Sequence, residues 1–286
     1  MLYYYAHSGH KVGLDRVKRA AALLKILTKE GMETRLLVND FRAGLAAKDF
    51  GIRESVTIET VQDIDAIAEL GDSIIIDSPE NDRGRLEKYC SGFHKVFRFA
   101  NSSNDVSRYG EILLRYPCQD EHCLSSLIVD DFYLKQREKK ERVVMFFGDS
   151  DHDKVLLNHL HLFENKNIEL LLGHYFFVKY EDALDKTFSV LHESEEYMEV
   201  ISESKYVITS SFQTALEAKA SGATTLFLSL QESSQEEREI MKYFGILISD
   251  TIDISCLRND EISTHTIATE NQTTETSKGI IREILS

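Results

Sequence analysis

Short apolar runs of strand length alternate with helix-length segments along this chain, and the alternation occurs twice. In the first half the strand-like runs are residues 2–6, 34–38, 73–76 and 95–99, and residues 17–28 show apolar side chains at helical spacing. In the second half runs at 143–147, 168–172, 206–209 and 225–228 alternate with helical patterns at 154–163, 197–202, 214–221 and 236–244. Such alternation predicts parallel sheets covered by helices, so we expect an α/β fold with two Rossmann-like domains.

A strongly charged run, Gln136–Arg142, lies at mid-chain, where two such domains would need a linker. The length of 286 residues also exceeds what one compact core usually holds. We therefore predict an N-terminal domain at residues 1–138 and a C-terminal, nucleotide-binding domain at 139–286. The polar, Thr-rich stretch 259–277 is predicted to be a loop before a final helix at 279–285.

The net charge of −15 argues against nucleic acid or an anionic membrane as the main partner. A small anionic ligand remains compatible, because Lys11, Arg16, Lys18 and Arg19 form a local excess of cations. No apolar run approaches the length of a membrane span, and the N-terminus lacks the features of a signal peptide. We expect a cytoplasmic protein without an integral membrane segment, and its oligomeric state cannot be deduced.

The four cysteines are too few and too scattered for a disulfide framework, so we expect them to be reduced. The segment Cys118–Cys123 lacks the spacing of a metal clip and is interpreted as an ordinary loop. Neither a metal nor a cofactor is implied by the sequence.

Two segments of the first half follow strand-like runs and carry polar side chains. The loop containing His7, Gly9, His10 and Gly13 precedes a basic helix, where glycines and a helix start favour an anion, although a tight structural turn is an equal alternative. Asp77 directly follows a buried run and could act as acid or base or orient a sugar, or simply be a surface acid.

Two segments of the second half have the same placement. Gly148 and Ser150 form a strand-to-helix turn that could contact a ligand or only cap the helix. Further along, hydroxyl groups at a helix start could bind phosphate, and a glutamate one turn later could accept ribose hydroxyls; the alternative is an N-cap and a solvated acid. These residues are Ser210, Ser211, Thr214 and Glu217.

Together these segments resemble the UDP-sugar hydrolases of the pseudaminic acid pathway, members of the wider GT-B group that includes glycosyltransferases. The resemblance covers roughly residues 1–250 and consists of motifs in the right order rather than close identity. Its matching segments are Gly13–Arg19, Asp77 with Asp82, Ile128–Phe132, Gly148–Asp151, and Ser210–Glu217 followed by Gly222. It implies a GT-B-like fold with a cleft between the domains, and a uridine diphosphate site in the second domain.

The chain departs from the hydrolase pattern at the catalytic position. The family's catalytic histidine falls on Arg16, the preceding glycine on Asp15, and a tyrosine of the acidic segment on Pro79. Because a guanidinium cannot act as a general base at neutral pH, Arg16 is assigned to binding a diphosphate, and His7, His10 and Asp77 become the candidate bases. Sugar recognition is expected in the loops 7–12 and 80–85.

Two functions follow as hypotheses, and a Rossmann-like protein with no nucleotide ligand is a third alternative. The first is an enzyme that cleaves the anomeric C–O bond of a UDP-sugar and releases UDP, by hydrolysis or by transfer to an acceptor, in surface-glycan or nonulosonic acid metabolism. The alternative is a sugar-nucleotide-binding protein of the same fold without catalytic activity, motivated by Arg16 at the catalytic position.

Overall fold

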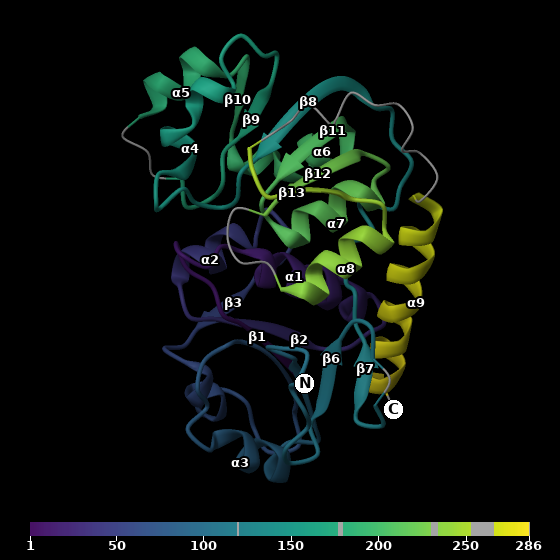
Figure 1. Ribbon diagram of the computed structural model, residues 1–286. Helices are drawn as coiled ribbons and strands as arrows, with labels where there is room; N and C mark the ends of the chain where they lie inside the picture. The colour runs from purple at the N-terminus through teal and green to yellow at the C-terminus, as the bar shows by residue number, and fades with distance from the viewer. Residues whose placement is uncertain (119, 177–179, 230–233, 253–265, 286) are drawn as a thin grey trace. The chain divides into compact units, whose positions relative to one another are not determined.

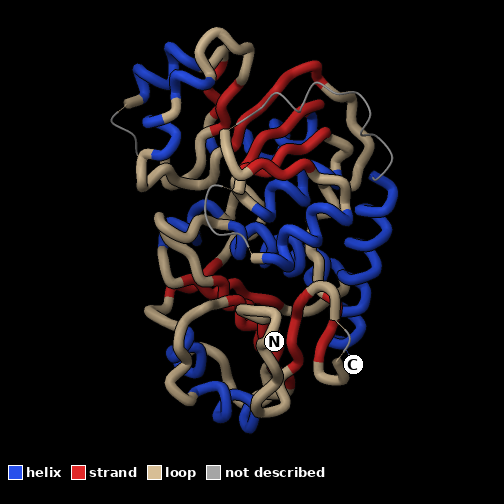
Figure 2. Tube along the Cα trace, in the orientation of Figure 1, coloured by secondary structure: helices blue, strands red, loops and turns tan. Residues whose placement is uncertain are grey.

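The computed structural model describes residues 1–118, 120–176, 180–229, 234–252 and 266–285, with side chains of 266–274 left undescribed. The chain divides into two compact units. Unit 1 comprises Met1–Gly9, Arg16–Ile128 and Gln272–Ser286, and unit 2 comprises His10–Asp15 and Val129–Asn271. Figure 1 labels most of the helices and strands of each unit, and Figure 2 colours the chain by type of secondary structure.

Unit 1 is built on a seven-stranded sheet in the order β3-β2-β1-β4-β5-β6-β7, with every neighbouring pair parallel. Its strands are β1 (Leu2–Ala6), β2 (Thr34–Val38), β3 (Ser55–Thr57), β4 (Ser73–Asp77), β5 (Lys95–Phe99), β6 (Ile112–Arg115) and β7 (Cys123–Ser125). The connecting helices are α1 (Asp15–Lys29), α2 (Phe41–Ala46), the 3₁₀ turn η1 (Val61–Ala66) and α3 (Arg85–Gly92).

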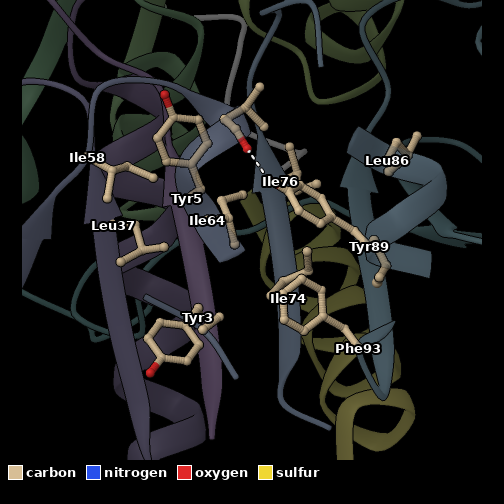
Figure 3. Packing of buried hydrophobic residues seen from close by; sticks show 13 residues of the cluster. Tyr3, Tyr5, Leu37, Ile58, Ile64, Ile74, Ile76, Leu86, Tyr89 and Phe93 are labelled. Atoms are coloured by element: carbon tan, nitrogen blue, oxygen red, sulfur yellow. Dashed lines mark hydrogen bonds between the residues drawn. The ribbon is translucent and has the colours of Figure 1, made fainter. Parts of the chain in front are cut away.

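The core of unit 1 forms around the aromatic strand β1. All five residues of β1 are buried, as expected for a central strand of a parallel sheet that is covered on both faces. Tyr3 and Tyr5 point to one face, where they pack with Leu37 and Ile74 (Figure 3). On the same face the hydroxyl of Tyr89 from α3 donates a hydrogen bond to the carbonyl of Val61, drawn dashed in Figure 3. Burial therefore leaves this aromatic hydroxyl satisfied.

Unit 2 contains a six-stranded parallel sheet in the order β10-β9-β8-β11-β12-β13. Its strands are β8 (Lys140–Phe146), β9 (Glu169–Leu171), β10 (Val190–His192), β11 (Ser204–Thr209), β12 (Thr224–Leu228) and β13 (Leu247–Ser249). Its helices are α4 (Val155–Asn158), η2 (Leu160–Leu162), α5 (Glu181–Thr187), η3 (Ser194–Glu196), α6 (Tyr197–Glu203), α7 (Phe212–Ala220) and α8 (Gln235–Tyr243). The core packs around Met145, Leu170, Ile208 and Leu226, one from each of four neighbouring strands.

The charged run at mid-chain differs from the predicted linker, because β8 begins within it at Lys140. Its charges are paired across the strand end. Arg142 donates to Ser204 Oγ at 2.9 Å and lies 3.4 Å from Glu169, while Lys140 lies 2.6 Å from Glu203. These contacts let a strongly charged sequence start a strand.

The C-terminal polar stretch also differs from its prediction. The helix α9 spans Thr266–Leu285, so residues 266–277 are helical rather than a loop; residues 259–265 lie outside the described residues. Thr276 is buried and donates from Oγ1 to the carbonyl of Leu127 at 2.8 Å, which is how a threonine-rich segment packs in unit 1 beside β7 (Figure 1). The predicted helix 154–163 begins one residue later, after the left-handed Lys154. It is interrupted at His159, whose backbone is not helical, so the segment divides into α4 and η2.

Cys118 and Cys123 form a disulfide, which corrects the expectation of an ordinary loop with reduced cysteines. The backbone N–H of Cys118 donates to Ser125 Oγ, and this contact holds residue 118 beside β7. The two Cα atoms are 6.0 Å apart. No helix among the described residues is long and apolar enough to cross a membrane.

Candidate functional site

A pocket of about 330 Å³ opens at the carboxyl edge of the unit 2 sheet. The chain order of the strands reverses between β8 and β11, and the loops that follow these two strands form the pocket. Such a reversal is where open α/β sheets bind their ligands. All lining residues belong to unit 2: His10, Lys11, Val12, Gly13, Asp15, Phe147, Gly148, Asp149, Ser150, Val155, Ser210, Ser211, Phe212, Phe227, Leu228, Ser229 and Glu237.

The turn after β8 is a tightly packed wall of this pocket. Gly148 has a φ of 144°, a backbone conformation that glycine adopts readily and residues with a side chain adopt rarely. Gly173 lies against the same turn, and a Cβ added to it would come within 2.3 Å of Asp149 Cα. The next two residues have different roles. Ser150 lines the pocket. The side chain of Asp151 accepts a hydrogen bond from the N–H of Leu156 at 3.2 Å and so caps the start of α4. Capping and pocket lining thus both occur within this turn.

The first turn of α7 forms the opposite wall. Ser211 is its N-cap, and Ser211 Oγ accepts from the N–H of Thr214 at 3.0 Å. Ser210 donates to the carbonyl of Phe147, which ties the loop after β11 to the end of β8. Both serines line the pocket, whereas Thr214 is completely buried beneath them.

Glu217 lies below this helix start and not on the pocket wall. It is 2% exposed, and its carboxylate accepts from Tyr197 Oη at 2.7 Å and from Gln213 Nε2 at 3.0 Å. Burial and the charge of Glu217 raise the pKa of Tyr133 and Tyr197 well above the ordinary value. The carboxylate therefore serves a buried hydrogen-bond network under α7.

The segment His10–Asp15 completes the pocket. Its backbone is fastened to the β8 turn, because the N–H of Leu14 donates to Asp149 Oδ2 at 2.8 Å. Gly13 has a φ of 78°, and its ideal Cβ position is 3.2 Å from the same oxygen. His10 lines this pocket and a second cavity of about 180 Å³, where its ring meets His152 with centroids 5.0 Å apart.

Asp15 contacts the N-terminus of α7 through its carboxylate. Ser211 Oγ donates to Asp15 Oδ1 at 2.7 Å, and the N–H of Gln213 donates to Asp15 Oδ2 at 3.3 Å. The pocket thus contains one lysine, Lys11, and the carboxylates of Asp15, Asp149 and Glu237. Hydrogen-bond donors suited to an anion and acidic side chains therefore lie on the same pocket walls.

Unit 1 places a different cluster at its own reversal of strand order, between β1 and β4. Asp77, at the end of β4, is 2% exposed. Arg19 approaches it with Nε at 2.9 Å and Nη2 at 2.7 Å, and Arg16 Nε lies 3.4 Å away. Tyr4 Oη also donates to it at 2.8 Å. Burial alone would lower the pKa of Arg19, but Asp77 and Tyr4 raise it. Asp77 is therefore a paired acid with its oxygens engaged.

His7 belongs to a second group in unit 1. Its Nδ1 lies 3.3 Å from Glu80 Oε2, which also accepts from Tyr5 and Ser78 at 2.5 and 2.9 Å. Burial would raise the pKa of Glu80, but the adjacent His7 and the hydrogen bonds from Tyr5 and Ser78 lower it to about 2. His7 thus faces an ionised carboxylate rather than the pocket of unit 2.

The structure brings together half of the site residues expected from sequence. His10, Gly13, Gly148, Ser150, Ser210 and Ser211 line one pocket, whereas His7, Gly9, Arg16 and Asp77 belong to unit 1. Sequence reasoning missed Lys11 and Glu237 on the pocket wall and Gly173 behind it. Lys11 stood out only as part of a cationic segment, and the other two carry no motif. Among the described residues no group of His, Cys, Asp or Glu has the arrangement of a metal site.

Comparison with known proteins supports the fold but gives no close relative. No family model matches the chain, and no curated protein matches its sequence. A kitacinnamycin glycosyltransferase structure matches with a TM-score of 0.64, 10% identity and coverage of 100% of this chain and 99% of that one. A UDP-N-acetylglucosamine 2-epimerase matches with a TM-score of 0.59, 10% identity and coverage of 99% and 95%. The S. aureus MnaA–UDP structure matches with a TM-score of 0.60, 11% identity and coverage of 99% and 95%.

These likenesses and the two parallel sheets define the class of fold. The chain has a GT-B-like fold of two Rossmann-like units, as the sequence predicted. Its solved neighbours include a UDP-sugar epimerase and several glycosyltransferases.

Proposed function

We propose that the chain binds a UDP-sugar in the unit 2 pocket and cleaves the bond between the anomeric carbon and the diphosphate, releasing UDP. The observation that carries this proposal is the position of the pocket at the strand-order reversal, between the β8 turn and the start of α7. Its volume of about 330 Å³ lies in the range of small-molecule sites. The UDP in the S. aureus MnaA structure gives the nucleotide to test first.

The pocket offers donors for a leaving diphosphate. The hydroxyls of Ser150, Ser210 and Ser211 line it, and the N-terminus of α7, where the N–H of Gln213 donates to the Asp15 carboxylate, borders it. Donors fixed in this way stabilise negative charge as it develops on the departing phosphate oxygen. Lys11 adds a positive charge on the same wall.

We assign proton transfer to His10, because among the described residues no other histidine lines this pocket. It would take a proton from water or from an acceptor hydroxyl as that oxygen attacks the anomeric carbon. Asp77 is a weaker candidate, since Arg19, Arg16 and Tyr4 already contact its carboxylate. We place the reaction in surface-glycan or nonulosonic acid metabolism, on the resemblance of the motifs.

A second function, binding of a UDP-sugar without turnover, is favoured by one observation. Arg16 occupies the position that holds a catalytic histidine in the resembling hydrolases, and it lies 3.4 Å from Asp77. A guanidinium in that position cannot accept a proton.

Release of UDP from UDP-N-acetylglucosamine, and from other UDP-sugars that stabilise the protein in a thermal-shift screen, distinguishes the two functions. The enzyme hypothesis expects steady release by the wild type, with a loss of about 10²–10⁴-fold in His10→Gln. His152→Gln is the matched control, because His152 touches His10 but lines only the second cavity. Stabilisation without release supports the binding protein, and absence of stabilisation by any UDP ligand overturns both.

A further inference from the structure

The carboxylate of Asp15 lies where an anion would bind at the start of α7. Asp15 accepts from Ser211 Oγ at 2.7 Å through one oxygen and from the N–H of Gln213 at 3.3 Å through the other. Ser211 is the N-cap and Gln213 lies in the first turn of α7, a nine-residue helix whose start borders the pocket. A hydroxyl and a backbone N–H at a helix N-terminus are the groups that also bind phosphate oxygens.

The contact joins residues far apart in the sequence but within one unit. Asp15 and Ser211 are separated by 196 positions, and both belong to unit 2. The backbone beside Asp15 is held independently, because the N–H of Leu14 donates to Asp149 Oδ2 at 2.8 Å. This second attachment keeps the Asp15 carboxylate close to the helix N-terminus and makes it a strong local competitor for the same donors.

We propose that Asp15 is an internal anion that competes with the ligand's diphosphate for the N-terminus of α7, so that ligand binding requires its carboxylate to move away. The inference rests on the proposed function for the identity of the ligand. A diphosphate arriving with Asp15 in place meets a helix dipole that is already neutralised and a like charge within the pocket. Asp15 thereby lowers the affinity of the pocket for phosphates and leaves binding of an uncharged nucleoside nearly unchanged.

Two substitutions separate the parts of this proposal. Asp15→Asn removes the charge and keeps an oxygen that can accept from Ser211, so the segment remains attached. Asp15→Gly removes the carboxylate altogether. Asp153→Asn is the matched control, since it removes one negative charge from an exposed residue that borders only the second cavity. Thermal melting in the absence of ligand verifies that each variant is folded.

Calorimetric titration with UDP, uridine and inorganic pyrophosphate tests the inference. We expect the Kd for UDP and for pyrophosphate to fall about tenfold in Asp15→Asn and Asp15→Gly, because a charged competitor is removed. The Kd for uridine should change less than about twofold, and Asp153→Asn should resemble the wild type. Equal UDP affinity in the wild type and both Asp15 variants overturns the inference while the proposed function stands.

Pyrophosphate makes the two claims separable. If the folded Asp15 variants bind pyrophosphate more tightly than the wild type, while no protein binds UDP, the internal anion stands and the proposed function fails. If no variant binds UDP or pyrophosphate more tightly than the wild type, the inference is overturned whatever the nucleotide result.

Discussion

Arg19 and Asp77 form a buried two-point ion pair in unit 1, with Arg19 Nε and Nη2 at 2.9 and 2.7 Å from Asp77 Oδ2. The side chain of Asp77 is 2% exposed and that of Arg19 is 22% exposed. The guanidinium also lies 4.1 Å from the centroid of the Phe99 ring. Removing one member of such a pair leaves the other charge buried without its partner.

The first prediction is that Asp77→Asn lowers the free energy of unfolding by about 3–5 kcal/mol, measured by urea denaturation. The matched control is Asp65→Asn. Asp65 pairs with Arg85 and Lys88, whose side chains are 44% and 61% exposed, so its loss should cost about 0–1 kcal/mol. Similar small losses in the two variants would show that the Asp77 cluster is not a structural ion pair.

The second prediction concerns the acid dependence of stability at Glu80. Its folded-state pKa is about 2, below the ordinary value of 4.5, so the unfolded state binds more protons in between. The stabilisation from ionised Glu80 is complete above about pH 4.5 and is lost as the pH falls toward 2. Glu80→Gln should therefore flatten the fall of the free energy of unfolding over this range. A curve parallel to that of the wild type would refute the role of ionised Glu80 in the acid dependence of stability.

The third prediction uses two glycines with opposite surroundings. A Cβ at Gly173 would come within 2.5 Å of Gly148 O, so Gly173→Ala must displace the β8 turn. We expect a loss of stability of about 1–3 kcal/mol together with weaker UDP binding. Gly279→Ala, in α9 with nothing near its Cβ, should instead stabilise by about 0.5–1 kcal/mol. Thermal unfolding of both variants gives the two signs directly.

The fourth prediction separates support of the pocket from contact with the ligand at Glu217. Because its carboxylate accepts from Tyr197 and Gln213, Glu217→Gln should lower the free energy of unfolding by about 1–3 kcal/mol. The Kd for UDP, measured well below the melting temperature, should change by less than about threefold. A large loss of affinity with unchanged stability would restore the sequence-based assignment of Glu217 to the ribose.

The sequence was sufficient for the parts of the fold that depend on local pattern. Buried runs such as Leu2–Ala6 and Ser73–Asp77 are strands because apolar and aromatic side chains fill both faces of a parallel sheet. Glycine and serine after β8 and β11 indicated a ligand edge because parallel strands end at the same edge of their sheet. Gly148, Ser150, Ser210 and Ser211 accordingly share one pocket.

The remaining features depend on contacts between distant residues, which no local pattern encodes. In the sequence Asp15 is only a departure from a motif, whereas in the structure it accepts a hydrogen bond from Ser211, 196 positions away. Glu217 has the spacing of a ribose ligand, but Tyr197 from the preceding helix engages it. Thr276 in the Thr-rich segment of α9 donates to the carbonyl of Leu127, 149 positions away. The Cys118–Cys123 disulfide, in contrast, joins residues five positions apart, and its spacing matches no motif.

Calorimetric titration of UDP into the wild-type protein and into Lys11→Met tests the central claim most directly. Lys11 is exposed on the pocket wall, and Lys242, an exposed lysine in the last turn of α8, provides the control variant Lys242→Met. We expect one UDP per chain, a Kd raised about tenfold in Lys11→Met, and no change in Lys242→Met. Absence of UDP binding to the wild type at millimolar concentration, or equal binding by Lys11→Met, would contradict a UDP site in this pocket.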